Sequence, residues 1–199
     1  EQSTFVKVSE GTYALRKNNP TINHNEQFIE NVTFHQSYGY EEFIEGIRPT
    51  PKDNGIAYVV EPGLFREFCK KAEENQEQDY VIIIDEINRG NISKIFGELI
   101  TIIEKDKRGI PVTLAYSKES FIVPENVFVI GTMNTADQSL THMDAALKRR
   151  FSLVEVMPDS LLLKSTKSGI PLGKLLEKLN DRIIMHSSRD NQIGHSYFM

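Results

Sequence analysis

The sequence lacks most of the features that define secreted, membrane or zinc proteins. It has one cysteine, Cys69, which excludes an internal disulfide and fits a reducing cytoplasm, where we expect the protein to act. No apolar run approaches the length of a membrane span, and no secretory apolar segment opens the sequence. The five histidines do not fall at metal-ligand spacings, so no zinc site is expected. No Gly-x-Ser-x-Gly elbow indicates a serine hydrolase.

The bulk composition is ordinary for a globular protein, at 39% hydrophobic and 26% charged residues. A net charge of −5 argues against strong nucleic-acid binding by this chain on its own. With 199 residues, the chain can form one α/β domain, or most of one and part of a second. Cys69 falls in a helical apolar pattern, which predicts a buried structural thiol.

The most informative segment is a run of apolar residues that ends in two acids, Tyr80–Asp85 followed by Glu86. Such a run is typical of a strand buried on both faces of a parallel sheet. At its carboxyl end, Asp85 can hold a hydrated Mg²⁺ and Glu86 can polarise a water molecule, as in the Walker B motif. The alternative is a core strand that ends in a solvated acidic loop.

Two later segments carry side chains suited to the same chemistry. A second buried strand, 127–131, leads into Asn134, which can hydrogen-bond a γ-phosphate or orient the attacking water, or can simply cap a turn. The basic triplet Lys148, Arg149 and Arg150 precedes an apolar segment. Either it solvates a helix end, or one arginine reaches the nucleotide of a neighbouring subunit and stabilises charge on the transferred phosphoryl group.

The order of apolar patterns predicts alternating strands and helices, as in a parallel sheet. We expect strands at 28–34, 56–60, 80–85, 127–131 and 151–156, helices at 40–47, 62–74 and 91–103, and a hairpin at 112–123. A linker from Pro158 leads to a helix at 172–185 that opens a second, smaller helical domain. His195, near the end of the sequence, is more typical of a solvated residue than of a catalytic one.

A phosphate-cradling loop, Gly-x4-Gly-Lys-Ser/Thr, is missing from the sequence. The nearest match, residues 169–175, has the wrong spacing, lacks the hydroxyl and follows the Asp85 strand instead of preceding it. The loop either precedes residue 1 or has been lost. We therefore expect residues 1–199 alone to bind nucleotide poorly and to be inactive.

Several segments in combination resemble the McrB-type AAA+ proteins, the nucleotide-hydrolysing subunits of modification-dependent restriction systems. The resemblance extends over roughly residues 28–199, through several similar segments. They are residues 34–49, 84–98 and 104–109, the signature Met133-Asn134-Thr135-Ala136-Asp137, the arginine-finger region 146–151, and a lid segment at 193–198. One departure is Gln138, which stands where the family usually has arginine.

The resemblance implies an AAA+ αβα core with a parallel sheet at 1–157 and the start of a helical lid at 158–199. It further implies hydrolysis of GTP, possibly ATP, with Mg²⁺ supported by Asp85 and water activated by Glu86. Asn134 and Asp137 would form the polar site of the signature, and Arg149 or Arg150 would act on a neighbour's nucleotide.

The family's usual partners follow from the same resemblance. It implies a homo-oligomeric ring, which in this family is usually a hexamer, an McrC-type nuclease subunit, and DNA contacts through a separate domain. Two alternatives are a non-hydrolysing assembly module and a general AAA+ remodelling ATPase. A phosphate loop directly before residue 1 would decide for the enzyme.

Overall fold

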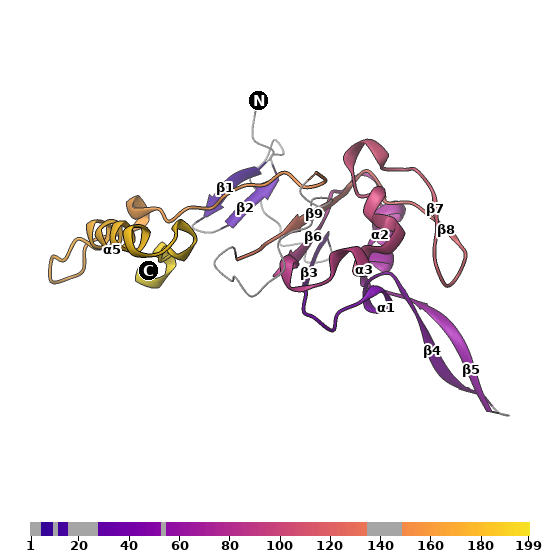
Figure 1. Cartoon of the computed structure of the whole chain (residues 1–199). Coiled ribbons are helices and arrows are strands. Elements are labelled where there is room, and N and C mark those ends of the chain that lie inside the picture. Colours follow the sequence, from indigo (N-terminus) through magenta and orange to yellow (C-terminus); the bar gives the residue numbers. More distant parts are fainter. Residues whose placement is uncertain (1–4, 10–11, 16–27, 53–54, 135–148) are drawn as a thin grey trace.

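The computed structural model describes residues 5–9, 12–15, 28–52, 55–134 and 149–199, and its centre is a parallel sheet (Figure 1). The sheet has three strands in the order β3, β6, β9. Their bounds are Ile29–Thr33, Tyr80–Asp85 and Val127–Gly131. Both pairings are parallel, so the carboxyl ends of the three strands lie at one edge of the sheet. The predicted α/β class with a parallel sheet is confirmed. A separate antiparallel hairpin joins β1 (Phe5–Ser9) and β2 (Thr12–Leu15).

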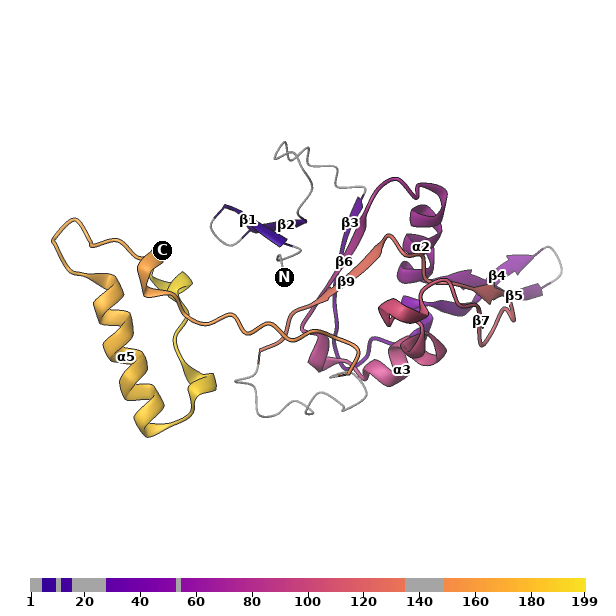
Figure 2. The same cartoon turned by 90° about the horizontal axis from the view of Figure 1, so that it is seen from above.

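The hydrophobic core lies between the sheet and three helices that occupy the same side of it (Figures 1 and 2). These are α1 (Tyr40–Phe43), α2 (Leu64–Glu74) and α3 (Ile92–Phe96). Along β6, buried residues alternate with half-buried ones, so the strand is sealed on the helical face only. This differs from the predicted burial on both faces.

Aromatic rings join the three helices. The ring of Phe43 stacks on Phe65 at a centroid distance of 5.0 Å and meets Phe96 edge-on at 5.0 Å. Cys69 of α2 is buried in the same core, and burial raises the pKa of its thiol well above the usual value. The predicted structural role of Cys69 is confirmed.

Residues 45–62 form an antiparallel hairpin, where the sequence predicted the end of a helix and a strand of the parallel sheet. The helix stops at Phe43, and β4 (Glu45–Lys52) pairs with β5 (Gly55–Pro62). Pro49 and Pro51 lie within β4, where a helix would lose two backbone hydrogen bonds. Figures 1 and 2 show the hairpin projecting from the core.

One face of this hairpin is apolar beyond its base, where Glu45 lies. Cross-strand neighbours point to the same face, so the register brings together the following side chains: Ile47 with Val60, Pro49 with Tyr58, and Pro51 with Ile56. Tyr58 is 75% exposed and Ile56 is 70% exposed. No described residue covers this face beyond its base.

The helix expected at 91–103 is interrupted at Gly97. Asn91 caps α3 as its sequence position predicted, accepting a hydrogen bond from the Lys94 N–H at 3.0 Å. Gly97 then adopts φ +52°, and the chain continues as the 3-10 segment η3 (Gly97–Thr101). A Cβ at Gly97 would lie 2.9 Å from the Tyr40 ring, so the break also allows α1 to approach closely.

The segment 151–156 is not a strand, contrary to the prediction. Val154 is 83% exposed and Val156 is 79% exposed. A strand requires a neighbouring strand for its backbone groups, and no strand in the described part of the chain pairs with this segment. Its β-branched residues therefore lie along an extended, exposed connection.

Beyond this connection, α5 (Leu172–His186) lies apart from the sheet in both views (Figures 1 and 2). Three 3-10 segments accompany it: η5 (Ser160–Leu162), η6 (Arg189–Asn191) and η7 (His195–Phe198). The side chain of buried Asn180 in α5 donates a hydrogen bond from Nδ2 to the Ile193 carbonyl at 3.0 Å. Its Oδ1 accepts one from the Ile193 N–H at 2.7 Å. His195 Nδ1 accepts a hydrogen bond from the Asp159 N–H at 3.1 Å, a structural role.

Among the described residues, no helix has both the length and the apolarity that a membrane crossing requires.

A further antiparallel hairpin pairs β7 (Val112–Thr113) with β8 (Ser120–Phe121). Glu45 anchors the loop between these two strands to the core. It is fully buried, and its carboxylate accepts hydrogen bonds from the Tyr116 N–H at 2.8 Å and the Ser117 N–H at 3.0 Å. Nη1 of Arg66 lies 2.6 Å from Glu45 Oε2, the other carboxylate oxygen. Burial opposes ionisation of Glu45, but these bonds and the Arg66 charge outweigh it and hold its pKa below the usual value.

Replacing Glu45 by glutamine is expected to lower the free energy of unfolding by about 3 kcal/mol, because buried donors and Arg66 lose their charged partner. A lowered native pKa contributes stability above the unfolded pKa, and that contribution is lost as the pH falls below about 4.3. Chemical unfolding at pH 7 and pH 3.5 should show the difference from wild type shrinking at the lower pH. Glu119→Gln, which removes an exposed partner of Arg66, is the matched control and should cost less than about 1 kcal/mol. An equal loss in both variants would contradict the prediction.

Candidate functional site

The candidate site lies where β6 and β9 end, at the carboxyl edge of the sheet. Asp85 is the last residue of β6, and Thr132 directly follows β9. Thr132 continues the pairing beyond the strands: its N–H donates to the Ile84 carbonyl, and its carbonyl accepts from the Ile87 N–H, both at 2.9 Å. The predicted neighbourhood of the two polar strand ends is therefore present in the structure.

The Thr132 hydroxyl joins the two acids at the end of β6. It donates a hydrogen bond to Asp85 Oδ1, and it accepts one from the Glu86 N–H at 3.4 Å. Asp85 is exposed at the sheet edge. The sequence analysis did not select Thr132. Its only signal was a hydroxyl residue directly after a buried strand.

Glu86 has an unusual backbone conformation. Its φ is +53°, in the left-handed region, and the chain turns there into the 3-10 segment η2 (Ile87–Arg89). Non-glycine residues rarely adopt this conformation, and it is concentrated at functional sites.

The Glu86 carboxylate retains hydrogen-bonding capacity inside the site. Its Oε2 is buried and forms an ion pair with Arg89, whose Nε lies 3.2 Å away, but it accepts no hydrogen bond from the described residues. Oδ1 of Asn88, two residues along, is likewise buried and accepts no hydrogen bond. Buried polar atoms of this kind usually have a protein or water partner. The arrangement fits a site that takes up a polar ligand or an attacking water.

Gly131 allows the two strand ends to pack closely. A Cβ at this position would lie 2.8 Å from Ile87 Cδ1, inside van der Waals contact. Ile87 is buried, so it cannot move out of the way without opening the core. The glycine therefore holds η2 against the end of β9, which keeps Asp85, Glu86 and Thr132 together.

The donor set fits Mg²⁺ better than a metal held entirely by protein. Among the described residues, no group of three or more His, Cys, Asp or Glu side chains forms a metal cage. Mg²⁺ is typically bound by one or two carboxylates together with phosphate oxygens and waters. The exposed Asp85 carboxylate suits this mode of binding.

Asn134 lies two residues after Thr132 and is exposed on the same connection. The structure thus brings Asn134 to the edge at which Asp85 and Glu86 lie. Asp137 and Gln138, the other signature positions, lie outside the described residues.

The two arginines of the basic triplet differ in their surroundings, and Lys148 lies outside the described residues. Arg149 is exposed. Arg150 is only 15% exposed, and its Nε lies 2.9 Å from Glu104 Oε1. The hydrogen bond from Lys107 lowers the pKa of Glu104, and the charges of Arg150 and Arg149 add to this against a smaller desolvation effect. Arg150 therefore has a carboxylate partner within its own chain.

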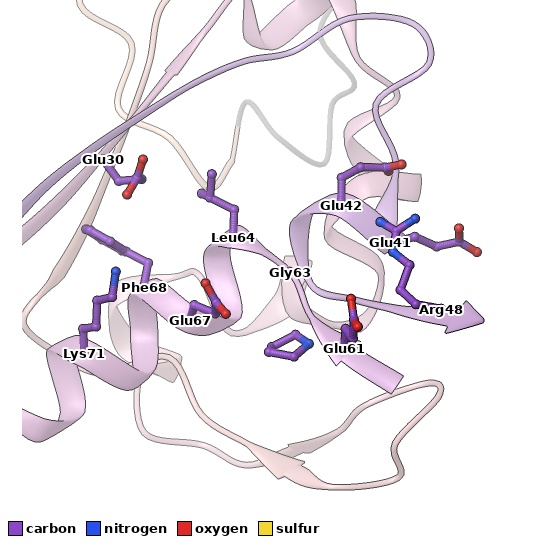
Figure 3. A pocket seen from close by; sticks show the side chains of 11 residues that line it. Glu30, Glu41, Glu42, Arg48, Glu61, Gly63, Leu64, Glu67, Phe68 and Lys71 are labelled. Atoms are coloured by element: carbon purple, nitrogen blue, oxygen red, sulfur yellow. The ribbon is translucent and has the colours of Figure 1, made fainter. Parts of the chain in front are cut away.

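A separate cavity of about 410 Å³ lies at the base of the β4–β5 hairpin (Figure 3). Its charged lining consists of five glutamates and two cations: Glu30, Glu41, Glu42, Glu61, Glu67, Arg48 and Lys71. None of the candidate site residues contributes to it. A surplus of negative charge repels a polyanion such as a nucleoside triphosphate. This cavity is therefore no candidate for the nucleotide.

Residues 22–151 match the family model for an AAA domain of the dynein-related subfamily. The chain belongs to this AAA family. Residues 171–199 match the alpha-helical lid domain of McrB, which places the McrB type of lid after the AAA domain. The resemblance drawn from the sequence is confirmed on both parts of the chain.

Two proteins that the chain is similar to are named as parts of restriction systems. The chain is 43% identical over 190 residues to the type IV methyl-directed restriction enzyme EcoKMcrB subunit of Escherichia coli (strain K12), covering 86% of this chain and 40% of the relative. It is 29% identical over 181 residues to the type II restriction enzyme BsuMI component YdiS of Bacillus subtilis (strain 168), covering 73% of this chain and 53% of the relative. The chain spans about half or less of the length of these relatives.

Proposed function

We propose that this chain is the nucleotide-hydrolysing part of an McrB-type subunit of a DNA restriction complex, with GTP as the substrate and ATP as a second candidate. The observation that carries the proposal is the arrangement of Asp85, Glu86 and Thr132 at the carboxyl edge of a parallel sheet. Ligands of open α/β sheets bind at this edge. The similarity to the EcoKMcrB subunit supports the restriction role.

Each residue has a distinct task in this mechanism. Glu86, with a carboxylate oxygen that accepts no hydrogen bond, polarises the water that attacks the γ-phosphorus. Asn134 and Asp137 of the signature orient that water or the phosphate oxygens. Asp85 would hold a Mg²⁺ ion, largely through water, and that ion would neutralise charge on the phosphates. Arg149 reaches the nucleotide of a neighbouring subunit, whereas Arg150 holds Glu104 in its own chain.

The proposal includes an oligomer and partners. A guanidinium that acts on a neighbour's nucleotide requires an interface between subunits, and a hexameric ring is the form that the resemblance favours. An McrC-type subunit would supply the nuclease, and a domain outside 1–199 would contact DNA. We place the boundary between the α/β core and the lid near residue 157, within the exposed connection that precedes α5.

A non-hydrolysing assembly module is the second candidate, because residues 1–199 contain no phosphate-cradling loop. The two candidates differ in turnover. We expect the whole protein to hydrolyse GTP with Mg²⁺, faster when an McrC-type subunit is added, and residues 1–199 alone to be inactive. Phosphate release with GTP and with ATP, at matched concentrations, measures both the activity and the base preference. Absence of phosphate release from an assembled whole protein would decide for the assembly module.

A further inference from the structure

Thr132 is in contact with both acids of the candidate site, through bonds of two kinds. Its backbone is tied to the chain on either side of Asp85 and Glu86, by the two 2.9 Å bonds to Ile84 and Ile87. Its hydroxyl then reaches between the acids, as a donor to Asp85 Oδ1 and an acceptor for the Glu86 N–H. The backbone hydrogen bonds fix the position of the Thr132 hydroxyl. The hydroxyl in turn contacts the Asp85 carboxylate and the Glu86 N–H.

We propose that Thr132 is a positioning residue for the Asp85–Glu86 pair, an inference that rests on the proposed nucleotide hydrolysis. Its bond to Oδ1 sets the rotation of the Asp85 carboxylate, so that the other oxygen is presented to the ion that accompanies the nucleotide. Its bond to the Glu86 N–H supports the left-handed backbone of Glu86, which costs free energy unless neighbouring groups hold it. Thr132 itself contacts neither the attacking water nor the phosphate in this role.

The surroundings explain why a hydroxyl at this position has a large effect. Asp85 and Thr132 are both exposed, so without the bond the carboxylate rotates freely in water. Gly131 already holds the strand end against Ile87, so loss of the hydroxyl leaves the backbone in place. Removing it therefore changes the orientation of the acids without unfolding the edge of the sheet.

The test compares Thr132→Val, which keeps the shape and removes the hydroxyl, with Thr132→Ser, which keeps the hydroxyl. In the whole protein, Thr132→Val should raise the half-saturating Mg²⁺ concentration for GTP hydrolysis and lower kcat, each about tenfold, the effect of one charged hydrogen bond. Thr132→Ser should stay within about twofold of wild type. A merely structural role would lower the melting temperature of both variants and leave the Mg²⁺ dependence unchanged.

Residue-resolved hydrogen exchange, without nucleotide, gives a readout independent of turnover. The Glu86 amide, which bonds the hydroxyl, should exchange about tenfold faster in Thr132→Val. The Ile87 amide, which bonds the Thr132 carbonyl, should be unchanged and serves as the internal control. Equal Mg²⁺ dependence and equal Glu86 exchange in wild type and Thr132→Val would overturn the inference. If the wild type hydrolyses no nucleotide, the proposed function fails, and the Glu86 exchange still decides whether Thr132 holds the pair.

Discussion

Replacing Glu86 by glutamine is expected to slow nucleotide hydrolysis by the whole protein about 10²–10⁴-fold, the usual contribution of a general base. Glutamine keeps the size of the side chain and loses the carboxylate that polarises water. Asp85, Thr132 and the backbone of the site are unchanged, so binding of the nucleotide with Mg²⁺ should persist. Single-turnover phosphate release measures the chemical step, and calorimetry measures binding.

The matched control for this prediction is Glu125→Gln. Glu125 is exposed in the turn before β9, at the opposite end of the sheet from the candidate site. The same chemical change there should leave turnover at the wild-type rate. Near wild-type hydrolysis by Glu86→Gln would refute the role of Glu86 as the group that activates water.

The largest effect is expected for Arg149→Ala, which should lower turnover about 10³–10⁵-fold if its guanidinium stabilises charge on a neighbour's phosphoryl group. Exposure of Arg149 in the single chain fits a group whose target lies on another subunit. Arg189→Ala is the matched control, because Arg189 is 62% exposed and its ion pair with Glu155 lies at the surface. It should leave turnover unchanged.

Mixed assemblies test whether Arg149 acts between subunits. Subunits with Arg149→Ala keep Glu86, and subunits with Glu86→Gln keep Arg149, so some interfaces in a mixture combine both intact groups. Hydrolysis should therefore recover well above that of either variant alone. Mixtures that assemble but stay inactive would show that the basic triplet only solvates a helix end.

The fold was predictable where a local pattern and its burial agree. The run Tyr80–Asp85 and the segment 127–131 are strands because an apolar, β-branched stretch of that length needs a sheet on which to pack. The hairpin 45–62 was not predictable from apolar spacing, because its exposed face is as apolar as a core strand. Val154 and Val156 show the converse: strand-forming residues form no strand without a neighbour to pair with.

The two acids of the candidate site were predictable from the sequence, but the residues that contact them were not. Asp85 and Glu86 were identified because charge directly after a buried strand has few structural explanations. Thr132 was missed because a threonine at a strand end is common, and only the three-dimensional register brings its hydroxyl between the Asp85 carboxylate and the Glu86 N–H. The separate surroundings of Arg149 and Arg150 depend on Glu104, some forty-five residues earlier, and no spacing rule connects them.

The β4–β5 hairpin combines an exposed apolar face with an edge that resists aggregation. Pro49 and Pro51 have no N–H to donate, so they are accommodated in β4 only on the side that lacks a partner strand. A third strand that approached β4 would meet a row of donors with two gaps, which prevents continuous pairing. Such a hairpin keeps its apolar side chains in water without becoming the template for an intermolecular sheet.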